Sequence, residues 1–258
     1  MSTAPSITYL DNVGGSQSMQ VYKRLSYDLL DLAPGHSVLD VGCGIGDDAR
    51  ALAARVGARG KVTGVDKDLA MIAEAWRRNS SGNLPVEFCL GEAHKLEFGD
   101  GNFDACRSER LLQHLEHPGS ALAEMVRVAR PGGKIVIGEP DWDTLIVEAE
   151  DRRITRKIVD FICEKLVCNP DVGRKLRSAF LKAGLHQVRV AGVVVMLNDF
   201  NLAEQIWRLR SHSEMAREAG AISGAEHSRW ISSLTSAQEA GSFFAACLGF
   251  VAVGAKRA

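Results

Sequence analysis

The sequence has little of what would indicate a nucleic-acid-binding or membrane-spanning protein. Its 31 basic and 32 acidic residues nearly cancel, so no broad positive surface is expected for nucleic acid or an anionic membrane. The longest apolar run, around residues 243–253, is too short for the roughly 20 residues that a membrane helix needs. Residues 1–17 have neither a basic region nor a long apolar stretch, so no signal peptide is expected.

Paired cysteines and the short motifs of several enzyme classes are also missing. No CxxC pair occurs, so neither a disulfide framework nor a zinc ribbon is indicated. The cysteines lie in apolar contexts and are expected to act as small hydrophobic residues in a reducing cytoplasm: Cys43, Cys89, Cys106, Cys163, Cys168 and Cys247. The chain lacks G-x-S-x-G, H-E-x-x-H and P-loop motifs, which argues against hydrolase, zinc-protease and phosphoryl-transfer chemistry.

What the sequence does contain is a glycine-rich turn between a strand and a helix. Residues 38–41 form a short apolar run typical of a buried parallel strand. Gly42, Gly44 and Gly46 follow, and a helical pattern occupies residues 47–56. This order predicts the first half of a nucleotide-type α/β unit, with glycines where the backbone must approach a ligand closely.

The residues after the turn indicate which ligand it suits. A dinucleotide motif would place a third glycine at position 47, where this chain has Asp47, followed by Asp48. Two carboxylates at this helix start would repel a pyrophosphate, which disfavours an NAD(P)-dependent oxidoreductase. A cofactor with a cationic centre and an amino-acid end, such as S-adenosylmethionine (SAM), suits the turn better. The two acids can alternatively serve only to cap the helix.

Strand and helix patterns alternate along the rest of the first half of the chain. Further strands are predicted at 61–65, 86–90, 103–107 and 134–138, and helices at 16–32, 68–79 and 121–129. Beyond Glu139, we predict helices at 151–167, 171–183, 199–220 and 224–240, with strands at 188–197 and 243–253. This alternation predicts an α/β fold with a parallel sheet.

The stretch VLDVGCGIG resembles the glycine motif of class I SAM-dependent methyltransferases, and the features from Ser37 to Glu139 follow their order. The chain is most similar to the small-molecule branch, which includes quinone-biosynthesis and natural-product enzymes. The resemblance implies a Rossmann-like seven-stranded, mostly parallel sheet with an antiparallel last strand, helices on both faces and a helical cap. It implies one domain over 1–258, with a core of about 33–140, 184–197 and 243–256 and a cap of 1–32, 141–183 and 198–240.

The resemblance also implies a set of cofactor-binding residues. Asp66, at the end of the second strand, would accept hydrogen bonds from the ribose hydroxyls, while Asp68 is better placed to cap the next helix. Glu92 stands where the family usually has Asp to accept from the adenine amino group, so this carry-over is less direct. The expected contacts are Asp40, Gly42, Cys43, Gly44, Asp66, Lys67, Met71, Glu92, Ala93, Arg107 and Ser108.

The expected activity is transfer of a methyl group to O, C or N of a small, partly apolar metabolite. Candidate bases are His114 and Glu109; His114 is three residues from Leu111 and could face the cleft, or it could only fix the loop before Pro118. All the tyrosines lie near the N-terminus, which favours a substrate lid there over a plain helix covering a sheet edge. The predicted substrate contacts are Tyr9, Tyr22, His114, His117, Trp142 and His212.

No metal is expected, because Asp141 and Asp143 alone suit turn or substrate roles. The anticipated partner is a small-molecule acceptor, with no nucleic acid or membrane, and the protein is expected to be a monomer or homodimer in the cytoplasm. A different class stays open at this point: a SAM-binding protein of the same fold that does not transfer methyl, such as a cyclase or binding module.

Overall fold

The computed structural model describes residues 7, 9–11, 17–80, 82 and 84–257. Within them, seven strands form one sheet in the order β3-β2-β1-β4-β5-β7-β6. The predicted N-terminal cap, residues 1–32, includes residues 1–6, 8 and 12–16, which lie outside the described part. None of the described helices combines the length and the apolar character needed to cross a membrane.

The first half of the chain builds the parallel part of the sheet. Its strands are β1 (Ser37–Val41), β2 (Lys61–Asp66), β3 (Val86–Leu90) and β4 (Phe103–Glu109), and its helices are α2 (Gln17–Leu29), α3 (Asp47–Val56), α4 (Leu69–Asn79) and α5 (Pro118–Val128). Parallel pairing aligns Val38 of β1 with Val62 on one side and Ala105 on the other. The carboxyl ends of these strands therefore meet at one edge of the sheet, where α/β proteins bind ligands.

The second half completes the sheet and adds helices beyond its end. It comprises β5 (Ala129–Val147), α6 (Arg152–Phe161), a π turn at Ile162–Leu166, α7 (Val172–Lys182), β6 (His186–Leu197), α8 (Phe200–Trp207), α9 (Leu209–Glu218), α10 (Gly224–Glu239) and β7 (Ala245–Ala255). A 3₁₀ turn at Leu112–His114 lies in the first half, between β4 and α5. β7 runs antiparallel to both β5 and β6. The predicted mostly parallel, seven-stranded fold with an antiparallel last strand is confirmed.

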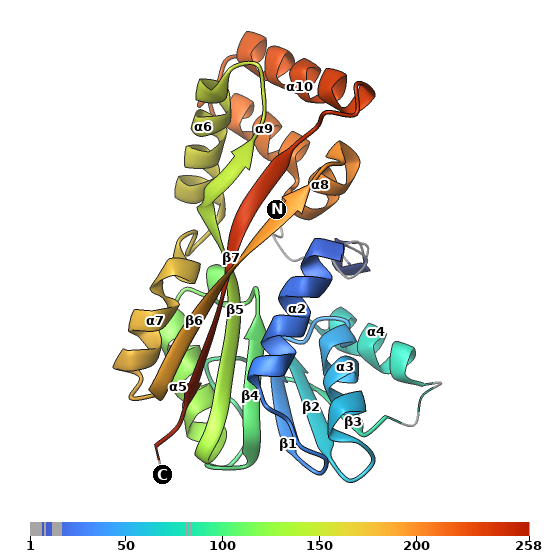
Figure 1. The fold of residues 1–258 in the computed structure, drawn as a ribbon, viewed down its shortest axis with the longest axis vertical. Helices are drawn as coiled ribbons and strands as arrows, with labels where there is room; N and C mark the ends of the chain where they lie inside the picture. Colours follow the sequence, from blue (N-terminus) through green and yellow to red (C-terminus); the bar gives the residue numbers. More distant parts are fainter. Residues whose placement is uncertain (1–6, 8, 12–16, 81, 83, 258) are drawn as a thin grey trace.

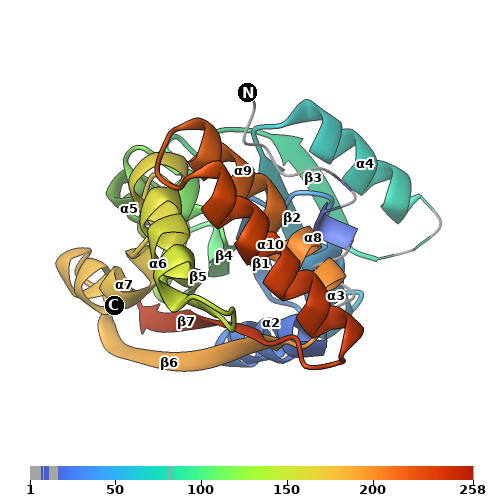
Figure 2. The same ribbon diagram turned by 90° about the horizontal axis from the view of Figure 1, so that it is seen from above.

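Helices cover both faces of the sheet. On one face, buried residues of α2, α3 and α4, such as Tyr22, Leu52 and Ile72, share a core with Val38. On the other face, α5 and α7 pack Leu122, Met125 and Phe180 against the strands. Figure 1 shows α6, α8, α9 and α10 gathered beyond the carboxyl end of the central strands, and Figure 2 shows these helices from above.

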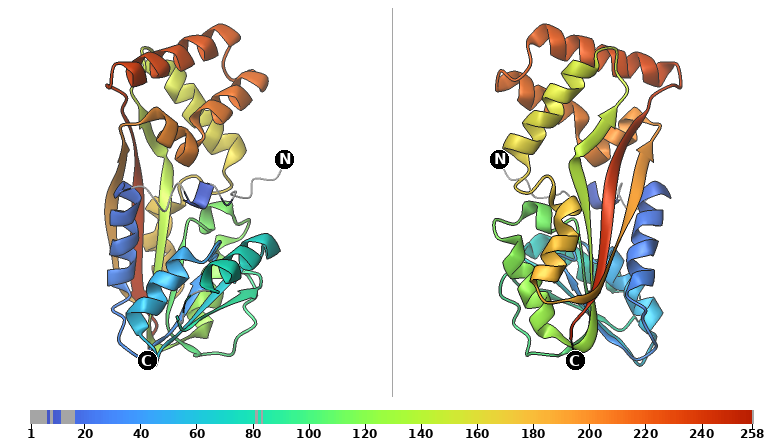
Figure 3. Two further views of the ribbon diagram at one scale, coloured as in Figure 1. Left: turned by 90° about the vertical axis from the view of Figure 1, so that its right-hand side faces the viewer. Right: turned by 60° about the vertical axis from the view of Figure 1, so that its left-hand side comes forward.

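Some boundaries differ from the predictions for local physical reasons. β5 extends well past the predicted 134–138 because β7 keeps pairing with it, through Pro140 opposite Gly249 and on to Val147 opposite Ala245. The predicted helix 199–220 is interrupted at Arg208, whose backbone takes the left-handed conformation (φ 51°). α7, which the sequence interpretation assigned to the cap, packs against β5, β6 and β7 instead (Figure 3).

Candidate functional site

The glycine turn after β1 is shaped by backbone conformations that other residues rarely adopt. Gly42, Gly44 and Gly46 have φ values of 75°, 51° and 77°. A Cβ on Gly46 would lie 2.5 Å from the ring of Phe88, so this glycine is required for packing of the turn against the sheet. A Cβ on Gly44 would lie 3.0 Å from Leu10 Cδ1, and one on Gly42 would lie 3.1–3.3 Å from the Leu111 side chain. The three glycines therefore add no side chains of their own to the turn, and only small spaces separate it from Leu10 and Leu111.

Asp66 ties the end of β2 to this turn. Its Oδ2 accepts a hydrogen bond from the Gly44 backbone nitrogen at 2.9 Å, and its Oδ1 accepts one from the Asp68 nitrogen at 2.9 Å. Each carboxylate oxygen keeps a further acceptor position, and the side chain is only half-buried. Asp68 caps α4 by accepting from Ala70, as the sequence suggested. Asp66 is thus placed to accept from two adjacent hydroxyl groups beside the glycine turn.

The other residues predicted to hold an adenosine group surround the same edge. Met71 and Ala93 are buried, and Lys67 and Glu92 are exposed. Cys43 is buried, and the backbone nitrogens of Gly42 and Cys43 both donate to the Val65 carbonyl, at 2.7 and 3.0 Å. The adenosine and amino-acid parts of SAM fit this edge, which offers a turn without side chains of its own, a half-buried carboxylate with unused acceptor positions and a mixed apolar and polar rim.

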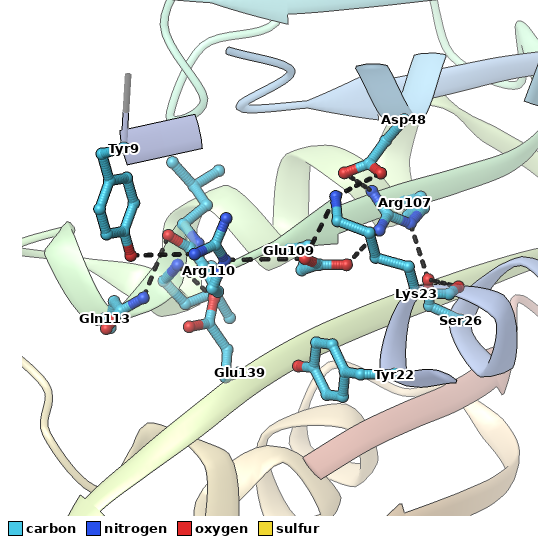
Figure 4. Close-up of polar contacts among 12 residues, drawn as sticks. Tyr9, Tyr22, Lys23, Ser26, Asp48, Arg107, Glu109, Arg110, Gln113 and Glu139 are labelled. Atoms are coloured by element: carbon cyan, nitrogen blue, oxygen red, sulfur yellow. Dashed lines mark hydrogen bonds and ion pairs between the residues drawn. The ribbon is translucent and has the colours of Figure 1, made fainter. Parts of the chain in front are cut away.

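Beneath the turn lies a buried polar cluster, which Figure 4 shows between α2 and the sheet. Arg107, 1% exposed, donates to Asp40 at 3.1 Å and to Asp48 at 3.2 Å, and it also bonds Glu109. Its Nε donates to Ser26 of α2 at 3.0 Å. These bonds favour a supporting role for Arg107 over the predicted direct contact with the cofactor. Ser108, also predicted to bind cofactor, is fully buried.

The two acids at the start of α3 have different partners. Asp47 pairs with Arg50 at the surface. Asp48 turns inward, where it accepts from Lys23 at 2.6 Å and bonds Tyr27. Burial alone would raise the pKa of Asp48, but the charges of Arg107 and Lys23 hold it well below its usual range. Asp48 therefore anchors α2 to the glycine turn, which goes beyond the simple helix cap that the sequence allowed.

Next to the turn lies a small, partly open cavity of about 40 Å³. Tyr9, Tyr22, Trp142 and Trp207 give it aromatic walls, and Arg110 and Gln113 are its polar members. The remaining lining residues are Met19, Pro140, Val195, Ile206, Cys247, Leu248 and Gly249. Such a lining suits a small, partly apolar ligand.

The cavity and the glycine turn share a wall made by two pairs of consecutive residues. Tyr9 lines the cavity, while Leu10 lies against Gly44. Arg110 lines the cavity, while the Leu111 side chain lies over Gly42, within 3.1–3.3 Å of the position of a Cβ there. Arg110 Nη1 donates to the Tyr9 hydroxyl at 2.9 Å, which joins the two pairs. A ligand in the cavity and one on the turn would therefore be neighbours.

The predicted substrate residues divide into two groups. Tyr9, Tyr22 and Trp142 line the cavity. His212 lies outside it, with its ring 6.1 Å from that of Trp142, and burial lowers its pKa to about 4. His114 and His117 are exposed. The expected inward orientation of His114 is wrong, because in the tight 3₁₀ turn Leu112 and Gln113 occupy the buried side.

Two functional candidates were missed. Gln113 is 3% exposed and accepts a hydrogen bond from Trp142 Nε1 at 2.7 Å. Glu139, fully buried at the end of the parallel stretch of β5, accepts from the nitrogens of Leu111 and Leu112 at 2.9 and 2.6 Å and so holds the shared wall. Burial raises the pKa of Glu139 to about 8. Glu139 could have been predicted as a site residue, because it follows directly after a predicted strand. No neighbouring residue or motif in the sequence indicates a site role for Gln113.

The fold and the turn define an α/β protein that binds a nucleoside cofactor, and comparisons with known proteins identify the family. A methyltransferase-domain family model matches residues 39–137. The chain is 39% identical over 248 residues to an uncharacterized 37.1 kDa protein in transposon TN4556 of Streptomyces fradiae, covering 96% of this chain and 70% of that protein. It is 33% identical over 120 residues to the ubiquinone/menaquinone biosynthesis C-methyltransferase UbiE of Cupriavidus necator.

That second match covers 46% of this chain and 49% of the UbiE protein, so it spans about half the length of each. Among solved structures, the YcgJ protein of Bacillus subtilis superposes with a TM-score of 0.64 at 18% identity, covering 93% of this chain and 99% of that one, which shows the shared fold. Residues 39–137 therefore belong to the methyltransferase-domain family, and SAM is the cofactor.

Proposed function

We propose that this protein transfers the methyl group of SAM, bound at the Gly42–Gly46 turn, to a small, partly apolar acceptor in the adjoining cavity. The observation that carries this proposal is the wall shared by the two sites, in which Leu10 and Leu111 lie over the turn while Tyr9 and Arg110 line the cavity. When bound, SAM supplies a methyl group activated by its sulfonium charge. The residues of the chain align the acceptor and exclude water.

The cavity lining indicates the kind of acceptor. Tyr9, Tyr22, Trp142 and Trp207 offer flat apolar surfaces, which suit an aromatic or quinol-like ring. The UbiE relative, named as a C-methyltransferase of quinone biosynthesis, supports a ring of this type. If the acceptor is of this type, aromatic or quinol-like compounds should be enriched among the accepted substrates. NMR of the product would then show whether the new methyl group is on carbon, oxygen or nitrogen.

The direct experiment is incubation of the purified protein with SAM and a panel of hydroxylated aromatic and quinol compounds, followed by mass spectrometry. Methyl transfer predicts S-adenosylhomocysteine and a product heavier by one methylene group. A cyclase or binding module of the same fold would bind SAM but give neither product. Asp66→Ala should lose the product signal, and Asp68→Ala, altered only at a helix cap, should keep it.

His114 and Glu109 remain our candidates for removing a proton from the acceptor. Although the His114 side chain is exposed, desolvation by the residues around its ring and the positive charges of Arg110 and Lys67 lower its pKa, which favours the neutral form that a base requires. Glu109 is bonded to Arg107 within the buried cluster. A base role for His114 predicts that His114→Asn lowers the rate about 10²-fold or more and removes the acidic limb of the pH–rate profile. A small fall with an unchanged profile would contradict that role.

We also propose that the protein acts as a monomer or homodimer in the cytoplasm, without nucleic acid or membrane partners. The near balance of 31 basic and 32 acidic residues supports the absence of nucleic acid. Free cysteines, several of them buried, support a reducing compartment. An assembly larger than a dimer, detected by size-exclusion chromatography with light scattering, would contradict the proposal of a monomer or homodimer.

A further inference from the structure

Arg110 is the only charged residue among the described residues that line the cavity. Its Nη1 donates to the Tyr9 hydroxyl at 2.9 Å, and the guanidinium carbon lies 5.5 Å from the centre of the Tyr9 ring. Its Nε is buried, has no hydrogen-bond partner and lies 3.6 Å from Glu109 Oε1. A buried, unused donor in a largely apolar cavity favours a ligand that brings a hydrogen-bond acceptor to it.

The neighbouring carboxylates do not neutralise this charge fully. Glu109 is shared with two other cations, because it bonds Arg107 and lies 3.7 Å from Lys23 Nζ. Asp48 is engaged by Lys23 and Arg107. The buried Nε of Arg110 therefore still lacks a hydrogen-bond acceptor, which an anionic ligand in the cavity would supply.

The backbone fixes Arg110 in this position. Its φ of 52° is a conformation that non-glycine residues rarely adopt. The Arg110 nitrogen donates to the Gly138 carbonyl at 2.9 Å, and Glu139 holds the next two nitrogens. Strain kept in place by such bonds occurs most often where a side chain must be aimed at a ligand. Gln113, whose Oε1 accepts from Trp142, lies beside Arg110, because its Nε2 donates to the Arg110 carbonyl at 3.3 Å.

We propose that the methyl acceptor carries an ionised oxygen, a carboxylate, phenolate or enolate on an aromatic or conjugated ring, and that Arg110 binds this oxygen. The inference rests on the proposed function only in taking the cavity as the acceptor site. Arg110 acts as a specificity-determining residue, since a neutral analogue of the same shape would offer its guanidinium a weaker acceptor than an ionised oxygen does. An oxygen anchored at Arg110 lies beside Leu111 and hence next to the glycine turn.

Calorimetry with two ligands of matched shape, 2-naphthoate and the neutral 2-naphthalenemethanol, tests this inference without any variant. Wild-type protein should bind naphthoate at least about 10-fold more tightly than the alcohol. Arg110→Met should bring this ratio close to one by weakening naphthoate binding, while Arg110→Lys keeps most of the preference. Arg229→Met, altered at a surface arginine half-exposed beside Asp151, should leave the ratio unchanged.

Equal affinities in the wild type, or an unchanged preference in Arg110→Met, would overturn the inference. S-adenosylhomocysteine binding, measured on the same samples, separates this outcome from failure of the proposed function. Retained cofactor binding and methyl transfer without a naphthoate preference would refute the role of Arg110 alone. A naphthoate preference that depends on Arg110, in a protein without methyl transfer, would support this anion site and refute the proposed function.

Discussion

The carboxylate of Asp66 lies 2.9 Å from the backbone nitrogen of Gly44 and accepts its hydrogen bond, although 22 positions separate the two residues in the chain. This bond joins the end of β2 to the turn after β1. It fixes the carboxylate beside the part of the turn that carries no side chain. The position of the ribose in the bound cofactor, as we infer it, follows from this one relationship.

Asp66→Ala should weaken binding of S-adenosylhomocysteine by about 2–3 kcal/mol, because hydrogen bonds from two hydroxyl groups to a charged acceptor are lost. Asp68→Ala is the matched control, because the Asp68 side chain accepts from the Ala70 nitrogen as the cap of α4 and is not expected to contact the cofactor. It should lower stability by about 1 kcal/mol and leave affinity unchanged. Calorimetry that finds wild-type affinity in Asp66→Ala would show that Asp66 does not contact the cofactor.

Gly44→Ala should reduce cofactor affinity at least about 10-fold, because the added methyl group enters the space over the turn where Leu10 already lies 3.0 Å away. Gly57→Ala is a close control: Gly57 has a similar φ of 65°, but no atom lies within 4 Å of the position that a Cβ would take there. Gly44→Ala should lose about 1 kcal/mol of stability from backbone strain, and Gly57→Ala about 1–3 kcal/mol, because its φ of 65° and ψ of −179° are essentially restricted to glycine. Equal affinities in the two variants would contradict a cofactor site at Gly44.

The site features that the sequence revealed are local ones. The turn at Gly42–Gly46 and the acid at the end of β2 follow directly from a strand, a break and a helix, so their positions could be predicted from neighbouring residues. The cavity could not be predicted in this way. Its walls combine Met19 of α2, Ile206 of α8 and Leu248 of β7, which only the completed fold brings together.

The role of the buried cluster was equally hidden. Arg107 followed an apolar strand pattern and was expected at the cofactor, yet its partners Ser26, Asp40 and Asp48 lie 59 to 81 positions away. The hydrogen-bond partners of this buried arginine come from distant parts of the chain, so the spacing of residues in the sequence does not predict them. The side on which His114 lies was predicted from α-helical spacing, but the segment forms a 3₁₀ turn with a different periodicity.

Glu139 should make the stability of the protein fall as pH rises from about 4.5 to about 8. Burial raises its folded-state pKa to about 8, above the unfolded value, so the folded protein binds more protons in this window. Glu139→Gln removes this titration while keeping an acceptor for Leu111 and Leu112. The stability of the variant relative to wild type should therefore increase with pH, by at most about 1.4 kcal/mol per pH unit.

Urea unfolding at pH 5, 6.5 and 8 measures this difference. Glu124→Gln is the control, because hydrogen bonds from Arg127 hold the pKa of Glu124 low and its contribution is already complete at pH 6.5. Its stability relative to wild type should be the same at pH 6.5 and 8. A constant difference between Glu139→Gln and wild type across the whole window would show that Glu139 does not titrate there.

Activity should survive removal of metal ions. In the part of the chain that the structure describes, no three His, Cys, Asp or Glu side chains are grouped closely enough to hold a metal ion. Asp141 and Asp143 are engaged by Arg174 instead. Turnover with excess EDTA should equal turnover without it. A loss that added magnesium restores would contradict this expectation and point to ligands outside the described residues.

The most direct test of the central claim, that the Gly42–Gly46 turn binds SAM, is a comparison of S-adenosylhomocysteine with NAD and NADP by thermal unfolding and calorimetry. A ligand that binds the folded state raises the melting temperature. S-adenosylhomocysteine should raise the melting temperature of the wild type and do so much less in Asp66→Ala, whereas NAD and NADP should have no effect. Stabilisation by NAD or NADP and none by S-adenosylhomocysteine would contradict the account.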